Sequence, residues 1–488
     1  MLWPTHIPKL TPSLLSSWAH LSYPRLCAAF LKLFVAPTDP DLTHADIDAI
    51  CASAFGSFGS DAVVPIVPLV HGTHLAELWH GRTLAFKDLG MSVLGRVLDH
   101  LLTRRREQLT LLVGTSGDTG SSAIEAVRGL GAVRVVVLYP LSGWSSITRV
   151  QERQMTSVAE CEANVHVVGV EGTSDELDVP IEACFRDRSC ADRHRLGSVN
   201  SVNVVRLLVQ AVHFVYAHLQ TCEDDMGEGA EAPTQFAVPC GAGGHLSGGL
   251  LALQMGLRAQ LIACTNANDA MHRVLSTGSM TSGAPTKQTT SPSMDIQMPY
   301  NVWRILFVAS GGDGGAVRAW QQRMEASGTL QVPQAVRKWI AERIRTVSVS
   351  DDETLQTLRE VHAACGHVLD PHTAVGVAGM LRSPFGLHGT RVCLGCAHAV
   401  KFLPAIARAL RCDLRAALDA LPELARGHAG VVAVGEMARR LLLSEPTEDE
   451  LRSPPGCTAI FRRGQDWEAG LRRLLDKVAP IGAARSKL

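Results

Sequence analysis

The sequence has almost no net charge. Its 488 residues include 46 lysines and arginines and 47 aspartates and glutamates, so the formal net charge at pH 7 is −1. A chain without an excess of positive charge produces no long-range field that attracts a polyanion. We therefore expect no nucleic-acid partner.

Long apolar runs are also missing. No run approaches the ~20 residues that a membrane-spanning helix needs, and Pro4, Pro8 and Pro12 interrupt the region where a secretion signal would be continuous. We therefore expect no membrane partner and a cytoplasmic location. The first 38 residues contain no Asp or Glu, which leaves a mitochondrial location as the weaker alternative.

The cysteines form neither a disulfide pattern nor a metal-binding pattern. There are 13 of them, an odd number, scattered from Cys27 to Cys457, whereas secreted disulfide frameworks use an even set in a small domain. Cys393 and Cys396 form a single CxxC with no second pair of ligands, and no HExxH occurs. The sequence therefore predicts reduced thiols and no metal site.

What the sequence does contain is an alternation of apolar runs and helical stretches. The length favours about three domains or two large ones. Strands are predicted at 109–113, 133–138, 165–170 and 236–239, with an edge strand in the proline-broken run 63–70. Helices are predicted within 13–59 and at 121–130, 204–219 and 250–257. Continuous β-branched strands that are each followed by a helix predict an α/β fold with parallel sheets.

Two glycine clusters lie between a predicted strand and a predicted helix. They are Gly114-Thr-Ser-Gly-Asp-Thr-Gly120 and Gly241-Ala-Gly-Gly-His245. Backbone N–H groups at a helix N-terminus favour anions, and glycine lets a ligand approach the backbone. Neither cluster matches GxSxG or GxGxxG, so a hydrolase elbow and a dinucleotide site are disfavoured. Either loop taken singly is more simply a tight strand-to-helix connection.

Lys87 lies next to Phe86 and just before an apolar helical stretch. A lysine at a helix start is usually solvated. The alternative is a desolvated amine with a lowered pKa, which is suited to Schiff-base chemistry. Sequence position alone favours the solvated reading.

Taken in order, these pieces resemble the threonine synthase family of enzymes that use pyridoxal phosphate (PLP). Residues 77–88, Glu-Leu-Trp-His-Gly-Arg-Thr-Leu-Ala-Phe-Lys-Asp, resemble the signature around the PLP-binding lysine, and residues 114–126 resemble the substrate loop. Further similar segments are 151–155, 198–203 with Arg206, 266–273, 293–297 and 370–376. Within the family, the loop 241–245, the segment 293–301 and the tail 461–467 resemble the animal threonine synthase-like 2 group.

The resemblance implies a role for each candidate residue. Lys87 would bind PLP covalently and then act as the base at the substrate Cα. The backbone of Gly241, Ala242, Gly243, Gly244 and His245 would hold the cofactor phosphate. Cys396 lies where the family has a threonine that contacts the pyridine nitrogen. Ser116, Gly117, Asp118 and Thr119 would bind the substrate carboxylate, and Asn203 and Arg206 are candidates for the rest of the substrate, with Arg206 alternatively an ordinary surface arginine.

The resemblance also implies the architecture. It is the fold type II PLP-dependent fold, similar to tryptophan synthase β, with two α/β domains and the cofactor in the cleft between them. We expect an N-terminal helical region over 1–75, a smaller α/β domain with the PLP lysine over 76–215, and a larger α/β domain over 216–488. The family's opening Ser-Thr-Arg-Gly segment does not occur, so we expect region 1–75 to be shorter than in relatives.

Three functions stay open at this point. The resemblance favours a PLP-dependent phospho-lyase that degrades small phosphorylated amino acids, O-phosphohomoserine and O-phosphothreonine, to 2-oxobutanoate. A threonine synthase would share the lysine and both loops but add water at Cβ. A paralogue without catalytic activity would keep the fold for binding or signalling. The oligomeric state is also open, with a homodimer among the states considered.

Overall fold

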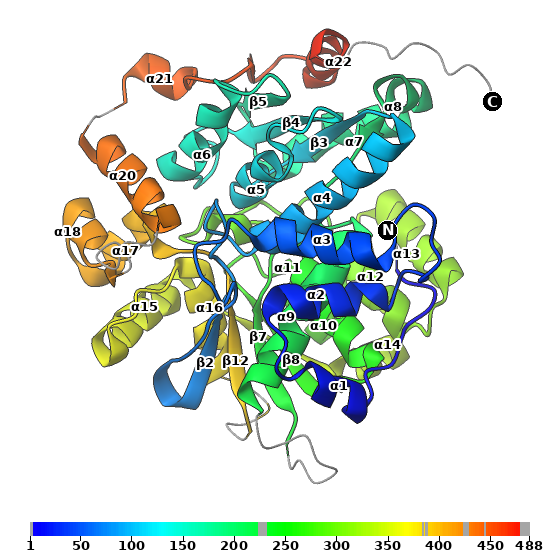
Figure 1. Ribbon diagram of the computed structural model, residues 1–488. Helices are drawn as coiled ribbons and strands as arrows, with labels where there is room; N and C mark the ends of the chain where they lie inside the picture. The colour runs from blue at the N-terminus through cyan, green and yellow to red at the C-terminus, as the bar shows by residue number, and fades with distance from the viewer. Residues whose placement is uncertain are drawn as a thin grey trace.

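Two sheets organise the molecule, one above the other in Figure 1. The computed structural model describes residues 3–222, 232–382, 385, 389–422, 429–443 and 446–478. Both sheets are mainly parallel and carry helices on both faces, as predicted for an α/β fold.

The smaller sheet has five parallel strands in the order β13-β5-β4-β3-β6. They are β3 (Leu109–Gly114), β4 (Val133–Pro140), β5 (Val165–Val170), β6 (Leu196–Gly197) and β13 (Ala459–Phe461). The apolar runs predicted as strands form its centre, which confirms that prediction. Alternate side chains point to opposite faces of a strand, so Val113 packs with α4 and α5 while Leu112 packs with α7.

Within the described ranges, six helices cover this sheet. One face carries α4 (Lys87–Arg105), α5 (Asp118–Val127) and α6 (Arg149–Ala159), and the other carries α7 (Ser174–Arg186), α8 (Arg188–His194) and α22 (Trp467–Val478). Helix α5 begins three residues before the predicted start because the glycine loop ahead of it is already helical from Asp118.

The larger sheet has six strands in the order β1-β2-β12-β7-β8-β11. They are β1 (Ile66–Pro68), β2 (Thr73–Glu77), β7 (Thr234–Pro239), β8 (Ala259–Thr265), β11 (Ile344–Ser348) and β12 (Arg391–Gly395). The strand β1 is antiparallel to β2 and lies at the sheet edge, where a proline costs no ladder hydrogen bond. This position confirms the prediction of an edge strand in the run 63–70.

Helices α9 (Val204–Thr221) and α10 (Gly244–Met255) cover one face of the larger sheet, and α15 (Asp351–Cys365) and α16 (Pro371–Leu381) cover the other. The predicted N-terminal helices are α1 (Pro12–Trp18), α2 (Tyr23–Lys32) and α3 (His44–Phe55). Figure 1 shows α2 and α3 lying across the front of the molecule, where α2 packs on α9 and α3 on α4. The N-terminal region therefore joins helices of both sheets.

Further helices and strands complete the described chain. They are η1 (Val70–Gly72), α11 (Ala270–Thr277), β9 (Ser279–Thr281), η2 (Pro292–Met294), α12 (Val302–Ala309), α13 (Gly314–Ser327), β10 (Thr329–Gln331), α14 (Gln334–Ala341), η3 (Ala399–Phe402), α17 (Leu403–Leu410), α18 (Leu414–Asp419), α20 (Ala429–Leu443) and α21 (Glu448–Arg452). All 13 cysteines are free thiols, as predicted. Over the described ranges, no helix combines the length and apolar character that crossing a membrane requires.

The C-terminal part of the chain returns to the smaller sheet. Strand β13 pairs with β5, and α22 packs on α7, so residues 459–478 lie with the smaller sheet, although the predicted division assigned them to the larger domain. Figure 1 shows this return as the red end of the chain above the cyan strands. Strand β2 crosses the predicted boundary between residues 75 and 76 and pairs in the larger sheet. The division into three regions stays a prediction, with boundaries at 1–75, 76–215 and 216–488.

Candidate functional site

A pocket of about 120 Å³ lies where strands of the two sheets end. The residues that line it come from both sheets and from the segments between them. They are Phe86, Lys87, Gly114, Thr115, Ser116, Asp118, Thr119, Ser174, Asp175, Asp178, Asn200, Ser201, Arg206, Gln210, Pro239, Gly241, Ala242, Gly243, Gly244, His245, Ser293, Met294, Ile296, Met298, Tyr300, His372 and Cys396. Ligands of parallel α/β sheets bind outside the carboxyl ends of the strands, which is the place of this pocket.

The loop after β3 is held in shape by one side chain. Thr115 Oγ1 accepts hydrogen bonds from the N–H groups of Gly117 and Gly120, at 3.0 and 2.9 Å. Gly117 has φ +135°, and a β-carbon on it would lie 2.5 Å from Gln151 Nε2. Only glycine fits there, so the sequence of this loop sets the course of the chain from β3 into α5.

The loop after β7 brings the N-terminus of α10 to the pocket. Gly243 has φ +80°, and a β-carbon there would lie 2.4 Å from Met271 Cε. A β-carbon on Gly244, the first residue of α10, would lie 2.7 Å from Ser201 Cβ. The glycines therefore leave a cradle of bare backbone at a helix N-terminus, an arrangement that suits an anion.

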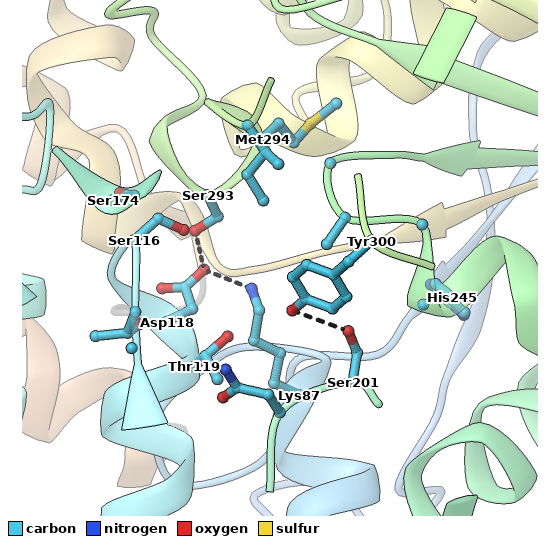
Figure 2. Close-up of a pocket in the computed structure, with 18 of the residues that line it drawn as sticks. Lys87, Ser116, Asp118, Thr119, Ser174, Ser201, His245, Ser293, Met294 and Tyr300 are labelled. Atoms are coloured by element: carbon cyan, nitrogen blue, oxygen red, sulfur yellow. Dashed lines mark hydrogen bonds and ion pairs between the residues drawn. The ribbon is translucent and has the colours of Figure 1, made fainter. Parts of the chain in front are cut away.

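Lys87 is the first residue of α4, and its amine projects into the pocket between Asp118 and Tyr300 (Figure 2). Its side chain is 12% exposed, and Nζ lies 3.5 Å from Asp118 Oδ2. Burial lowers the pKa of Lys87, and the nearby Lys401 and Arg206 lower it further, while Asp118 and Cys396 oppose them. Of the two interpretations open from the sequence, the structure favours the desolvated amine.

Asp118 is the centre of a buried network. Lys401 Nζ lies 2.6 Å from its Oδ1, with the lysine 0% and the aspartate 3% exposed. Gln151 Nε2 donates to Oδ1 at 2.8 Å, and Ser293 Oγ donates to Oδ2 at 3.0 Å. Burial alone would raise the pKa of Asp118, but Lys401 and Lys87 outweigh it and hold the pKa far below its usual range. The carboxylate is therefore charged and already fully engaged by the protein.

Lys401 was not among the candidate residues from the sequence. It lies in the segment Cys396-Ala-His-Ala-Val-Lys-Phe402, from which only Cys396 was chosen. The signal was a lysine that falls in an otherwise apolar stretch and is therefore more costly to bury than any neighbour. Its partner, Asp118 at the start of α5, could not be identified from the sequence.

Cys396 follows β12 at the pocket wall. Its N–H donates to Thr373 Oγ1 at 2.8 Å, and its thiol donates to Leu394 O at 3.8 Å. Burial, followed by the charge of Asp370, raises the pKa of the Cys396 thiol well above its usual value. The group presented to the pocket is therefore a neutral thiol.

His372 also lines the pocket and was likewise not predicted as a site residue. Its Nδ1 lies 2.7 Å from Asp370 Oδ1, and its Nε2 accepts from the Ser293 N–H at 3.1 Å. These partners place the proton on Nδ1. Since Ser293 also donates to Asp118, His372 fixes a segment that reaches the Lys87 side of the pocket.

His245 lines the pocket and contacts the rings of Phe86 and His213. It stacks on Phe86 with centroids 5.0 Å apart, and its Nε2 lies 3.0 Å from His213 Nδ1. Burial lowers the pKa of His245 to about 3, with Lys87 and Arg206 adding to the effect. The imidazole is therefore neutral and acts in packing and hydrogen bonding rather than as a cation.

The structure separates the two remaining substrate candidates. Arg206 lines the pocket from the first turn of α9, and its Nη1 donates to Val199 O at 3.0 Å. Burial lowers the pKa of Arg206 to about 10, so the guanidinium stays charged at neutral pH. Asn203 instead caps α9, where its Oδ1 accepts from the Val205 N–H at 3.0 Å, and Asn200 is the asparagine that lines the pocket. Gly117 shapes the loop without lining the pocket.

Comparison with known proteins places the chain in a family. Residues 75–397 match the family described as pyridoxal-phosphate dependent enzymes. The chain belongs to the PLP-dependent enzyme family. Threonine synthase-like 2 of Rattus norvegicus is 38% identical over 410 residues, which cover 83% of this chain and 82% of the relative. Threonine synthase of Pseudomonas aeruginosa is 37% identical over 410 residues, which cover 83% and 84%.

Solved structures agree with this placement. The PLP-bound threonine synthase of Brucella melitensis has a TM-score of 0.79 and 31% identity, and the match covers 98% of this chain and 93% of that one. Yeast threonine synthase has a TM-score of 0.76 and 30% identity, with 90% and 92% covered. This PLP-dependent enzyme is therefore of the threonine synthase-like group, and both the predicted fold type II architecture and the predicted cofactor are confirmed.

The residues present fit that cofactor. The pocket offers an amine of lowered pKa at Lys87 and a glycine cradle at a helix N-terminus, where β-carbons would collide with neighbours. A neutral thiol lies in the same pocket. An aldehyde, a phosphate and a ring nitrogen each have a chemically suitable partner among these groups.

Proposed function

We propose that this PLP-dependent enzyme is a catabolic phospho-lyase. It degrades O-phosphohomoserine and O-phosphothreonine to 2-oxobutanoate, ammonia and phosphate. One observation carries the proposal: a desolvated amine, Lys87, and a buried guanidinium, Arg206, line the same small pocket. The first suits proton removal from an amino acid, and the second suits a phosphate group.

In this proposal Lys87 and the loop 241–245 would hold PLP, and Cys396 would be the partner of its ring nitrogen. When bound, PLP supplies an electron sink that stabilises negative charge at the substrate Cα. The Lys87 amine takes the proton from Cα, because burial lowers its pKa and so favours the unprotonated form that accepts a proton. The Lys87 side chain is 12% exposed, which limits the access of water to the amine.

The substrate carboxylate is assigned to the loop 116–119. Its donors are the Ser116 and Thr119 hydroxyls and the N–H groups at the start of α5. The Asp118 side chain cannot hold a second carboxylate, because it is itself an anion paired with Lys401. We therefore assign Asp118 the task of holding the loop and the Lys87 amine in place. Arg206 receives the phosphate. Asn200, which lines the pocket, takes the substrate-binding role that the sequence suggested for Asn203, because Asn203 caps α9.

Threonine synthase is the second candidate. The similar proteins of Pseudomonas aeruginosa and Saccharomyces cerevisiae carry that name, at 37% and 32% identity. Such an enzyme would use the same lysine, loops and arginine but would also order a water molecule for addition at Cβ. The catalytically silent alternative is disfavoured by the intact lysine and its lowered pKa.

Product analysis tests the proposal. Holoenzyme is incubated with each phosphorylated amino acid, and 2-oxobutanoate, threonine and phosphate are measured. Keto acid with equal phosphate supports the phospho-lyase, threonine in its place supports the synthase, and no product supports the silent paralogue. Lys87→Ala should abolish turnover, whereas Lys338→Ala, at an exposed position on α14, should leave it unchanged. Turnover retained in the Lys87 variant would remove that residue from the mechanism.

A further inference from the structure

The pocket has an acidic corner that the proposed function does not use. It is formed by Asp175 and Asp178 in the first turns of α7. Asp175 is satisfied, since its Oδ2 accepts from Thr286 Oγ1 at 2.9 Å. Asp178 Oδ1 lies 2.9 Å from the point where Gly114 would carry a β-carbon, so this carboxyl rests against the end of β3. Within the described residues, no cation lies within 4.0 Å of Asp178.

The surroundings of Asp178 favour its uncharged form. Burial raises the pKa of Asp178 to about 7, and the charges of Asp175 and Glu182 on the same helix add to the effect. Beneath it, β3 presents the Gly114 backbone rather than a charged side chain. Tyr300 also lines the pocket. Burial raises the pKa of Tyr300, the charge of Asp178 raises it further, and the charge of Arg206 lowers it. Asp178 and Arg206 are therefore both close enough to Tyr300 to shift the pKa of its hydroxyl group.

A bound phosphate group must share the pocket with these side chains. Of the charged side chains that line the pocket, Lys87 is assigned to the cofactor and Asp118 is neutralised by Lys401. Among the described residues that line the pocket, Arg206 is then the lysine or arginine left for a phosphate group, and Asp175 and Asp178 on α7 are the remaining carboxyl groups. A phosphomonoester carries nearly two negative charges at pH 7. Placed at Arg206, it would be repelled by an ionised Asp178.

We propose that Asp178 takes up a proton from solvent when the pocket binds the phosphate group of its substrate, and then donates a hydrogen bond to a phosphate oxygen. The inference rests on the proposed function for the site of the phosphate. The proton balance is simple, because one carboxylate and one solvent proton become one carboxyl group. Above about pH 7 the affinity for a dianion should therefore fall by about tenfold per pH unit, as linkage requires.

Sulfate tests this without turnover, because it has the shape and charge of the phosphate group and does not itself titrate between pH 6 and 9. Sulfate binding to the holoenzyme is measured by calorimetry at pH 8 in buffers of different ionisation enthalpy. Wild-type protein should take up close to one proton per sulfate bound. Asp178→Asn should take up none and should bind sulfate with little dependence on pH. Asp192→Asn, an exposed aspartate on α8, should behave as wild type.

Three results would overturn the inference: no proton uptake by wild-type protein, uptake that persists in Asp178→Asn, or a sulfate affinity that stays flat from pH 6 to 9. The last uses wild-type protein alone, so it decides the matter if the variant does not fold. Keto acid formation without proton uptake would leave the proposed phospho-lyase intact and reject only the role of Asp178. Proton uptake without any product would support the role of Asp178 and reject the phospho-lyase.

Discussion

Lys401→Met is the most direct test of how the pocket is held together. The change keeps the length and apolar stem of the side chain and removes the charge that lies 2.6 Å from Asp118. Both partners are almost completely buried, at 0% and 3% exposure, so water cannot screen the carboxylate that is left behind. Removing one partner of a buried ion pair costs ~3–5 kcal/mol. We expect the lower end of that range, because Asp118 keeps Gln151, Ser293 and Lys87 as partners.

The assay is urea unfolding followed by tryptophan fluorescence, with the free energy of unfolding compared between variants. Asp118→Asn combined with Lys401→Met should recover part of the loss, because no buried charge is left unpaired. Arg439→Met is the matched control. It breaks an ion pair at 59% exposure, and pairs of this kind contribute little, so the free energy should stay within error of wild type.

The pH dependence gives a second test of the same reasoning. In wild-type protein the folded-state pKa of Asp118 is depressed, so its stabilisation is complete above the unfolded-state pKa and is lost only in strong acid. Without Lys401 the buried carboxylate gains a proton more easily, so the variant should be less destabilised at pH 5 than at pH 8. A loss below about 1 kcal/mol, the cost typical of an exposed pair, or a loss equal at both pH values, would refute this account of Asp118.

The remaining predictions concern the cofactor site. Gly243→Asp should lower PLP affinity, because it strains a residue at φ +80° and puts a carboxylate in the glycine cradle. The loss is measured as cofactor absorbance that disappears on dialysis. Gly366→Asp, at φ +72° in open space, is the control for backbone strain alone. Iodoacetamide at pH 8 should label the two exposed cysteines and spare Cys396, because burial raises the pKa of the Cys396 thiol. Mass spectrometry measures the labelling, and early modification of Cys396 would contradict this prediction. In protein stripped of PLP, acetylation of Lys87 should begin at lower pH than acetylation of the exposed Lys338, because burial lowers the Lys87 pKa. Acetylation profiles that coincide would count against a desolvated amine at Lys87.

Local features of the sequence were enough to predict much of the fold. The runs at 109–113, 133–138 and 165–170 are strands because continuous β-branched residues suit a sheet covered on both faces. Both glycine loops lie between a strand and a helix, and their glycines have the conformations or close contacts that other residues would not tolerate. These are properties of neighbouring residues, so they can be read without knowing the tertiary structure.

The composition of the pocket was only partly predictable. Lys87, Arg206 and the two loops meet there as the family resemblance led us to expect. Asn203 does not, because its side chain caps α9, and an N-cap asparagine and a pocket asparagine three residues apart look alike in sequence. The partners His372 and Lys401 were missed because each owes its role to a residue on another element.

The sequence by itself determined where the strands, the glycine turns and the candidate lysine lie, since steric and hydrophobic preferences act over a few residues. Only the tertiary structure decided that Lys401 neutralises Asp118, that His245 is paired with His213 and that β13 pairs at the edge of the smaller sheet. It also decided that Asp175 and Asp178 line the same pocket as Arg206. Burial and charge pairing depend on which elements pack together, and hydrophobic periodicity specifies the buried face of an element but not its partner.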